Sequence, residues 1–297
     1  MFSKFKINNE LLGIFYMILC QFSFATNDAF VKMIYLRYNE IFVLNQIIFI
    51  RGIFTLLFIL LFLYIKKKLD FRKIFSSKEL ILRGGLEASA ALFFFIGIAL
   101  LPFAQVYILL SAAPVLLTAL GAVFLNEKVR WRRWSAVWLG FIGVIVVINP
   151  GKLEFGYYFI FPILAAIMLS IRDMYTKSFK KNYHSLQIAF MTCFVVTFIF
   201  GLFSIYKFYD FSLKDIFILF ISAFFLALGY IFSVATIKVA LVSVTSTFRY
   251  SVILWGIIYG YFLFNEIPTI NSYIGALIII TSGLIILSRQ KKFGKIK

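Results

Sequence analysis

Eight ionisable side chains interrupt the apolar runs of this 297-residue chain, and these are the residues that could do chemistry. A charge within an apolar run is costly, so it is kept chiefly where it faces a cavity, pairs with another charge or meets a solute. Carboxylates in such places can carry a proton, and guanidinium groups can bind a carboxylate or phosphate through two parallel hydrogen bonds. The eight residues are Asp28, Lys32, Arg51, Arg83, Glu87, Arg172, Asp173 and Arg249.

The three carboxylates of this set, Asp28, Glu87 and Asp173, are the candidates for gating or for proton coupling. Arg83 and Glu87 are four residues apart, and this spacing on a helix predicts that they pair with each other. Lys32 lies near the end of its apolar run, so we expect its ammonium group to reach the membrane interface.

Two arginines are candidates for binding a solute. Arg51 lies in the middle of its run, where its guanidinium group needs a carboxylate, helix-end carbonyls, water or a solute. Two roles remain equally open for Arg51: it could hold helices together, or it could bind a solute. Arg249 stands beside Tyr250 within a polar stretch, and we expect it to bind the substrate.

A polar stripe adds aromatic and hydroxyl groups to this set. Tyr107, Ser111, Pro114 and Thr118 recur at spacings of three and four residues, so a continuous helix would place them on one inward face. A second stretch, from Ser243 to Glu266, repeats this pattern. Aromatic faces and hydroxyls suit a flat or cationic organic solute. We therefore expect Tyr107, Ser111, Tyr250 and Trp255 to line a binding cavity.

Composition defines the elements that must position these side chains. Hydrophobic residues make up 63% of the chain and charged residues 14%, whereas soluble domains carry roughly 25% charged residues. An apolar helix of about 20 residues crosses a bilayer. The sequence predicts an all-α polytopic membrane protein with ten transmembrane helices. They are expected near residues 11–34, 41–65, 80–100, 103–125, 134–149, 156–176, 185–206, 214–236, 241–264 and 271–288.

The lysines and arginines outside these runs gather on one side of the membrane. With the N-terminus in the cytoplasm, the inner segments hold 21 of them, and the outer loops hold only Arg37, Lys152, Lys207 and Lys214. Short cytoplasmic loops are rich in basic residues. This asymmetry predicts the inner (cytoplasmic) membrane with both termini in the cytoplasm. It also accounts for the net charge of +18, so we expect no nucleic-acid partner.

The two halves of the chain resemble each other. Residues 27–32 (NDAFVK) resemble residues 172–177 (RDMYTK) at an offset of 145, and Asn126-Glu127 resembles Asn265-Glu266 at an offset of 139. With five spans per half, the second half inserts in the opposite orientation, which is a recurring transporter architecture. The predicted units are a first repeat over residues 11–150, a second over residues 156–288 and a basic cytoplasmic tail over residues 289–297.

Residues along nearly the whole chain also follow the pattern of a known family. In the first repeat they are Leu101-Pro102, Pro114, Glu127, Arg133-Trp134, Gly140, Gly143 and Pro150-Gly151, and in the second Tyr250-Ser251, Leu254-Trp255-Gly256, Glu266, Gly275 and Gly283. They resemble the EamA-type repeats of the drug/metabolite transporter superfamily, closest to the branch with uptake carriers for S-adenosylmethionine and riboflavin. One departure is Ile253, which stands where the second repeat would carry the proline, so a helix break there needs another cause.

Enzyme signals are missing from the sequence. It has no phosphate-binding GxxxxGK[ST] loop and no HExxH or GxSxG motif, and its one histidine and two cysteines give no metal-ligand spacing. We expect no metal, no cofactor and no catalytic residue. An enzyme acting on a lipid or isoprenoid within the membrane stays an alternative of another class, as does a channel, although no repeated filter or charge ring supports the latter.

The sequence thus predicts a secondary active transporter that moves a small zwitterionic or amphiphilic metabolite by alternating access. An exporter or exchanger of the same fold is the alternative. Besides the substrate and the bilayer, the expected partners are a coupling proton or an exchanged solute. We expect a monomer or a weak homodimer.

Overall fold

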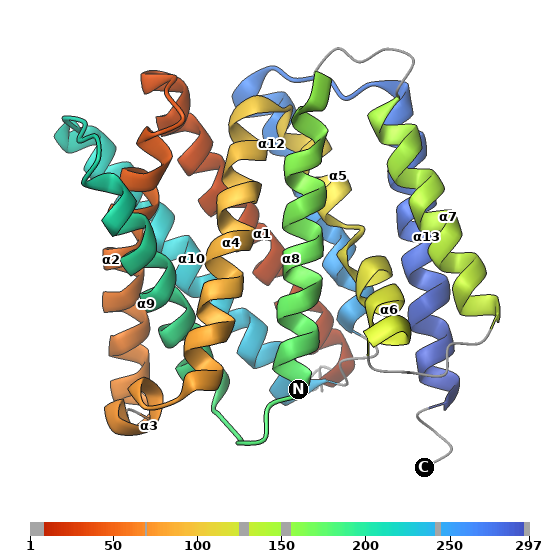
Figure 1. Cartoon of the computed structure of the whole chain (residues 1–297), viewed down its shortest axis with the longest axis horizontal. Helices are drawn as coiled ribbons and strands as arrows, with labels where there is room; N and C mark the ends of the chain where they lie inside the picture. Colours follow the sequence, from red (N-terminus) through yellow and green to blue (C-terminus); the bar gives the residue numbers. More distant parts are fainter. Residues whose placement is uncertain (1–8, 69, 125–130, 150–155, 241–244, 294–297) are drawn as a thin grey trace, which may run out of the picture.

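The computed structural model describes residues 9–68, 70–124, 131–149, 156–240 and 245–293, and within these ranges the chain forms helices and no strand. Figure 1 shows most of the helices running along one common direction, as in a bundle. The α-helices are α1 (Asn9–Tyr38), α2 (Val43–Ile65), α3 (Phe71–Phe75), α4 (Lys78–Leu100), α5 (Phe103–Leu110), α6 (Ala113–Phe124), α7 (Trp131–Ile148), α8 (Ile160–Lys177), α9 (Ser185–Ser204), α10 (Leu213–Val239), α12 (Ser251–Phe264) and α13 (Ile270–Phe293). Two 3-10 helices, η1 (Gly156–Phe159) and η2 (Ser246–Tyr250), precede α8 and α12.

Most of these helices are long and apolar enough to cross a bilayer. Seven segments of at least 18 residues meet that description, and shorter apolar helices cover Trp134–Ile148, Phe248–Phe264 and Ile270–Ile285. The prediction of an all-helical, multi-pass membrane protein is confirmed. The count of ten membrane crossings stays a prediction, because three of the apolar helices are shorter than a typical crossing.

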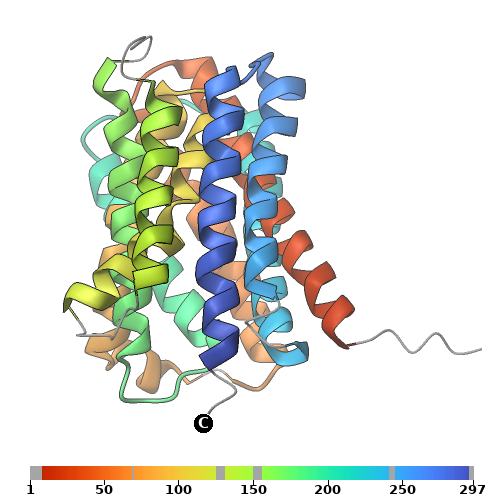
Figure 2. The ribbon, with the colours of Figure 1, turned by 90° about the vertical axis from the view of Figure 1, so that its right-hand side faces the viewer.

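The two halves of the chain interleave in a single bundle. The most extensive contacts of the described helices all join the first half to the second: α1 packs on α10 and α12, α4 on α8 and α9, and α7 on α13. Figures 1 and 2 both show α7 beside α13. A Cβ atom on Gly275 of α13 would lie only 2.8 Å from the carbonyl oxygen of Gly143 of α7. Small residues therefore let these two backbones approach closely, as in other membrane helix pairs.

The fourth apolar run, expected near residues 103–125, forms a candidate membrane span over Phe103–Leu120, but this span is divided into two helices, so the expectation of one shared polar face is wrong. Helix α5 ends at Leu110 and α6 begins at Ala113, with a turn at Ser111 and Ala112. Pro114 has no N–H to donate to the carbonyl of Leu110, and its ring crowds that carbonyl. Figure 1 shows α6 displaced from the line of α5. Tyr107 and Thr118 therefore do not share one helical face.

The ninth apolar run changes helix type, from the 3-10 helix η2 to the α-helix α12, without a gap between them. The 3-10 helix η2 ends at Tyr250 and α12 begins at Ser251, although no proline lies nearby. Adding the offset of 139 to the break in the fourth run, Ser111 and Ala112, gives Tyr250 and Ser251. The break and the change of helix type thus occupy corresponding positions in the two halves.

Both ends of the described chain lie at the same end of the bundle. Figure 1 shows the start of α1, the end of α13 and the short helix α3 together at the bottom of the view. This agrees with termini on one side of the membrane, and the cytoplasmic assignment stays a prediction. Glu127 of the repeat motif, Ser243 of the second polar stretch and residues 294–297 of the expected tail lie outside the described residues.

Candidate functional site

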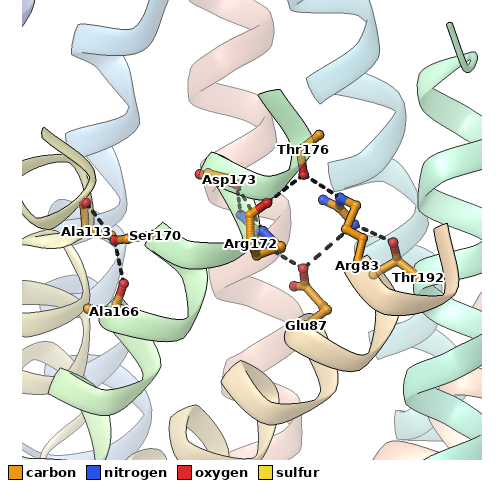
Figure 3. Close-up of polar contacts among 9 residues, drawn as sticks. All are labelled: Arg83, Glu87, Ala113, Ala166, Ser170, Arg172, Asp173, Thr176 and Thr192. Carbon is orange, nitrogen blue, oxygen red and sulfur yellow. Dashed lines mark hydrogen bonds and ion pairs between the residues drawn. The ribbon is translucent and has the colours of Figure 1, made fainter. Parts of the chain in front are cut away.

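A four-residue charge cluster joins α4 to α8, as Figure 3 shows. Arg172 donates from Nη1 to Glu87 Oε2 at 2.5 Å, and from Nη2 and Nε to Asp173 Oδ1 at 2.6 and 3.0 Å. Charge-assisted hydrogen bonds of this kind are roughly twice as strong as neutral ones. We call Arg83, Glu87, Arg172 and Asp173 the α4–α8 charge cluster.

Arg83 completes the cluster from the first turns of α4. Its Nη1 lies 3.9 Å from Glu87 Oε2, so the predicted pairing of the two residues is present, but the short contact of Glu87 is with Arg172. Arg83 also donates from Nε to Thr176 Oγ1 at 3.1 Å and from Nη1 to Thr192 Oγ1 on α9. The guanidinium group of Arg83 therefore holds three helices together around Glu87.

The α4–α8 charge cluster is partly open to its surroundings. The side chains of Arg172, Glu87 and Asp173 are 14%, 21% and 32% exposed. Within the described residues, Asp173 Oδ2 and Glu87 Oε1 have no hydrogen bond and no ion pair. These two oxygens can accept hydrogen bonds from a cationic solute.

Local contacts fix where α8 places its two charges. Ser170 of α8 donates to the carbonyl oxygens of Ala166, at 2.7 Å, and of Ala113 in the first turn of α6, at 2.9 Å (Figure 3). Because Ser170 ties α8 to the start of α6 in this way, Arg172 and Asp173 lie within one turn of the break in the fourth apolar run.

Arg249 lies at the end of η2 and is exposed. It makes no hydrogen bond or ion pair within the part of the chain that the structure describes, but it is close enough to Asp173 for their charges to interact. Arg249 is thus a guanidinium group near Asp173 that has no partner among the described residues.

A second cluster of polar groups is buried around Asp28 of α1. Its carboxylate accepts hydrogen bonds from the Tyr107 hydroxyl at 2.6 Å and from Asn27 Nδ2 at 2.7 Å. Arg51 of α2 donates to Asn27 Oδ1 at 3.1 Å and lies 4.0 Å from Asp28 Oδ1, and its guanidinium carbon lies 5.0 Å from the centre of the Phe95 ring. We call Asn27, Asp28, Arg51 and Tyr107 the buried Asp28 cluster.

Three of the expected cavity residues lie outside both clusters. Ser111 donates to the carbonyl of Tyr107 within its own helix. Tyr250 is buried with its hydroxyl against Gly283 of α13, and Trp255 packs edge-on against Phe22, with ring centres 4.9 Å apart. The Tyr250 hydroxyl and the Trp255 Nε1 have no hydrogen-bond partner in the described structure. The proposed role of all three in binding stays a prediction.

The two clusters occupy corresponding places in the sequence repeat. Adding the offset of 145 to Asn27 and Asp28 gives Arg172 and Asp173, and each pair is the centre of its cluster. The sequence repeat thus relates the two clusters to each other, and their role in transport stays a prediction. The repeat did not reveal that Arg172 and Arg83 bind Glu87, or that Asn27 binds Arg51, because these contacts join different helices.

The fold and the clusters together define the class of protein. Apolar helices with ionised groups between them, and a broken helix in the first half, are typical of a membrane carrier. The described residues contain no group of three or more His, Cys, Asp or Glu side chains that could hold a metal ion.

The comparison with known proteins gives the family. The chain matches the EamA-like transporter family over residues 11–149 and 155–288, and it belongs to that family, within the drug/metabolite transporter superfamily. The predicted resemblance is confirmed. The protein is therefore a membrane transporter and not an enzyme.

Several relatives are similar along almost their whole length. The chain is 27% identical over 292 residues to proteins named S-adenosylmethionine uptake transporter from Rickettsia conorii and Rickettsia prowazekii, covering 96% of this chain and 96% of each relative. It is 30% identical over 94 residues to a riboflavin transporter from Rhizobium johnstonii, covering 32% of this chain and 30% of the relative. A solved crystal structure shares the fold, with a TM-score of 0.57 and 11% sequence identity over 94% of this chain and 96% of that chain.

Proposed function

We propose that this protein is a secondary active transporter that takes up a small zwitterionic metabolite by alternating access across the cytoplasmic membrane. The observation that carries the proposal is the α4–α8 charge cluster, which is partly exposed and whose Asp173 lies near enough to the exposed Arg249 for their charges to interact. Ionisable groups held at such a place in a membrane bundle usually contact the transported solute.

The charges of the site match a solute with groups of both signs. The two arginines and two carboxylates of the cluster cancel, but the free oxygens of Asp173 and Glu87 still favour a cation. Arg249 adds a positive charge that can bind a carboxylate through two parallel hydrogen bonds. A solute that carries a cationic group and a carboxylate satisfies both sides of the site.

S-adenosylmethionine is the solute that we propose to test first. It carries a sulfonium, an ammonium and a carboxylate group, and it is the solute in the names of the two Rickettsia relatives. Its sulfonium and ammonium groups would lie at Asp173 and Glu87, and its carboxylate at Arg249.

Alternating access is supported by the corresponding features of the two halves. The first half carries a helix break, and the second half a change from 3-10 to α-helix, at positions related by the offset of 139, and both polar clusters lie at positions related by the offset of 145. Broken helices near the middle of the membrane form the central sites of many carriers built from inverted repeats. The inverted orientation, the ten crossings and the cytoplasmic termini are part of this proposal.

Uptake into liposomes tests the proposed function. Liposomes that contain the protein should accumulate S-adenosylmethionine from a mixture of cellular metabolites, as read by mass spectrometry. Decarboxylated S-adenosylmethionine, which cannot bind Arg249, should compete about tenfold more weakly, because a charged hydrogen bond contributes roughly 1.5–3 kcal/mol.

Liposomes without protein serve as the control. Accumulation of anionic solutes alone would contradict the proposed site, and a decarboxylated analogue that competes as well as S-adenosylmethionine would exclude a carboxylate at Arg249. Release of preloaded S-adenosylmethionine without any uptake would favour an exporter of the same fold.

A further inference from the structure

A buried ion pair joins α1 to the segment between α12 and α13. Lys32 Nζ donates to Glu266 Oε1 at 2.6 Å and to the carbonyl oxygen of Leu101 at 3.0 Å. Glu266 Oε2 accepts a hydrogen bond from the backbone N–H of Phe103 at 2.5 Å. The side chain of Lys32 is 4% exposed, so the expectation that it reaches the membrane interface is wrong. Its ammonium group binds the carboxylate of Glu266 within the protein instead of water.

Two aromatic rings close around the ammonium group. Lys32 Nζ lies 4.9 Å from the centre of the Phe264 ring and 5.8 Å from that of Phe103, and the two ring centres are 5.4 Å apart. The negative faces of aromatic rings attract a cation, and the attraction grows when water is excluded. The ion pair and the two rings therefore act as one closed contact.

The backbone around Glu266 holds its carboxylate in place. Asn265 has a left-handed conformation, with φ 53°, and ends α12. The N–H of Glu266 then donates to the carbonyl of Gly260 at 2.9 Å, as at many helix C-termini. The chain turns back at this point, so the Glu266 side chain lies against the start of α5.

The same side of α1 makes further contacts between this pair and the start of the helix. The hydroxyls of Thr26 and Tyr259 lie 2.5 Å apart, and the Tyr107 hydroxyl binds Asp28. Along α12 these contacts end at Trp255, and α1 packs on η2 beyond it, where a Cβ atom on Gly13 would lie 3.2 Å from Thr245 Cγ2, whereas the Arg249 side chain is exposed. The contact surface between α1, α5 and α12 is therefore closed at the Lys32 end.

The ion pair is poorly suited to a purely structural role. The Lys32 side chain is 4% exposed and the Glu266 side chain 21%, and taking charges even partly out of water costs free energy that their attraction only partly returns, so such a pair is weak evidence for stability. It also joins the two halves that must move in alternating access, since Lys32 lies in the first matched segment of the family and Glu266 in the second. A contact of small net free energy between moving parts can form and break readily.

We propose that Lys32 and Glu266 form a gate, an inference that rests on the proposed transport function. The pair closes the bundle at the Lys32 end while the site is open at the Arg249 end. When α1 moves away from α5 and α12, the Lys32–Glu266 and Tyr107–Asp28 contacts both break. This movement opens the bundle at the Lys32 end.

Cysteine labelling tests the gate independently of transport. Ala29 is a suitable reporter, because it is 1% exposed and lies on the same face of α1 as Phe22 and Thr26, three residues before Lys32. Cys20 and Cys193 are the native cysteines and are replaced by serine. An impermeant maleimide is then applied separately to each face of the membrane. In the double variant Lys32→Met/Glu266→Gln, which leaves neither charge unpaired, Ala29→Cys should react about tenfold faster from the Lys32 face.

The chain offers a matched control. Glu40 and Lys207 form a second ion pair between the two halves, but both side chains are 47% exposed. The hydrogen bond from Lys207 lowers the pKa of the Glu40 carboxyl below its ordinary value, so this pair is charged at neutral pH. The variant Glu40→Gln/Lys207→Met should label at the native rate, because exposed pairs contribute little. Glu266→Asp, which keeps both charges but shortens the reach, should give an intermediate rate.

An unchanged labelling rate in the folded Lys32→Met/Glu266→Gln or Glu266→Asp protein would overturn the gate. Size-exclusion chromatography shows whether each variant is folded, and Glu266→Asp decides the question if the double variant is not. Faster labelling without uptake of any solute by the native protein would contradict the transport function and not the movement. Normal uptake with unchanged labelling would contradict the gate alone.

Discussion

Replacing Arg172 by methionine should reduce the amount of folded protein and abolish transport. Arg172 donates three hydrogen bonds to Glu87 and Asp173, and its loss would leave two carboxylates facing each other. Removing one partner of a buried ion pair costs about 3–5 kcal/mol. The carboxylates here are 21% and 32% exposed, so we expect on the order of 3 kcal/mol in the free energy of unfolding, the lower end of that range. Thermal unfolding in detergent measures this change.

A triple variant separates folding from transport. Arg172→Met with Glu87→Gln and Asp173→Asn leaves Arg83 as the one charge of the cluster, and Arg83 keeps its hydrogen bonds to Thr176 and Thr192, so the variant should regain most of the lost stability. It should still not transport, because the groups that bind the solute are gone. A triple variant with normal uptake would show that the α4–α8 charge cluster only holds helices together.

Replacing Arg249 by lysine should weaken transport without affecting folding. Arg249 is exposed and has no hydrogen bond or ion pair within the described residues, so its substitution breaks no contact of the folded chain. Lysine keeps the charge but loses the planar pair of donors that binds a carboxylate. A lost charged hydrogen bond of about 1.5–3 kcal/mol predicts roughly tenfold or more in apparent affinity. Transport at varied substrate concentration measures it.

Arg249→Ala provides the decisive comparison with a structural role. We expect a normally folded protein with still lower affinity. If Arg249 instead held η2 in place through Asp173, the amount of folded protein would fall in the alanine variant, and adding Asp173→Asn would restore it. Native affinity in a well-folded Arg249→Ala protein would exclude a role in binding.

The class of protein could be predicted because it depends on local composition. Apolar runs and basic loops alone predicted a multi-pass helical membrane protein, and the charges within the runs were all noted as candidates. The comparison of Ile253 with Pro114 already treated Pro114 as a helix breaker, yet the polar stripe was extended with helical spacing through that proline, so its single face was wrong. The corresponding change of helix type at Tyr250 has no proline and no comparable local signal.

The partners of the charges could not be predicted, because they depend on which helices pack together. Lys32 was expected at the interface, a rule that depends only on its distance from the end of its run. Its carboxylate partner, Glu266, lies 234 residues away in the other half of the chain. Likewise, local spacing pairs Glu87 with Arg83, yet its shortest contact is with Arg172, 85 residues away. Such contacts follow from the interleaving of the two halves.

Counterflow in liposomes tests whether the protein transports S-adenosylmethionine by alternating access. Liposomes that contain the protein are loaded with unlabelled S-adenosylmethionine and diluted into a trace of the labelled compound. A carrier with alternating access exchanges one molecule for another, so the labelled compound should transiently accumulate inside above its external concentration. We expect this overshoot in the native protein and its loss in the folded triple variant of the α4–α8 charge cluster. Labelled compound that only equilibrates, without an overshoot, would contradict alternating access and indicate a channel.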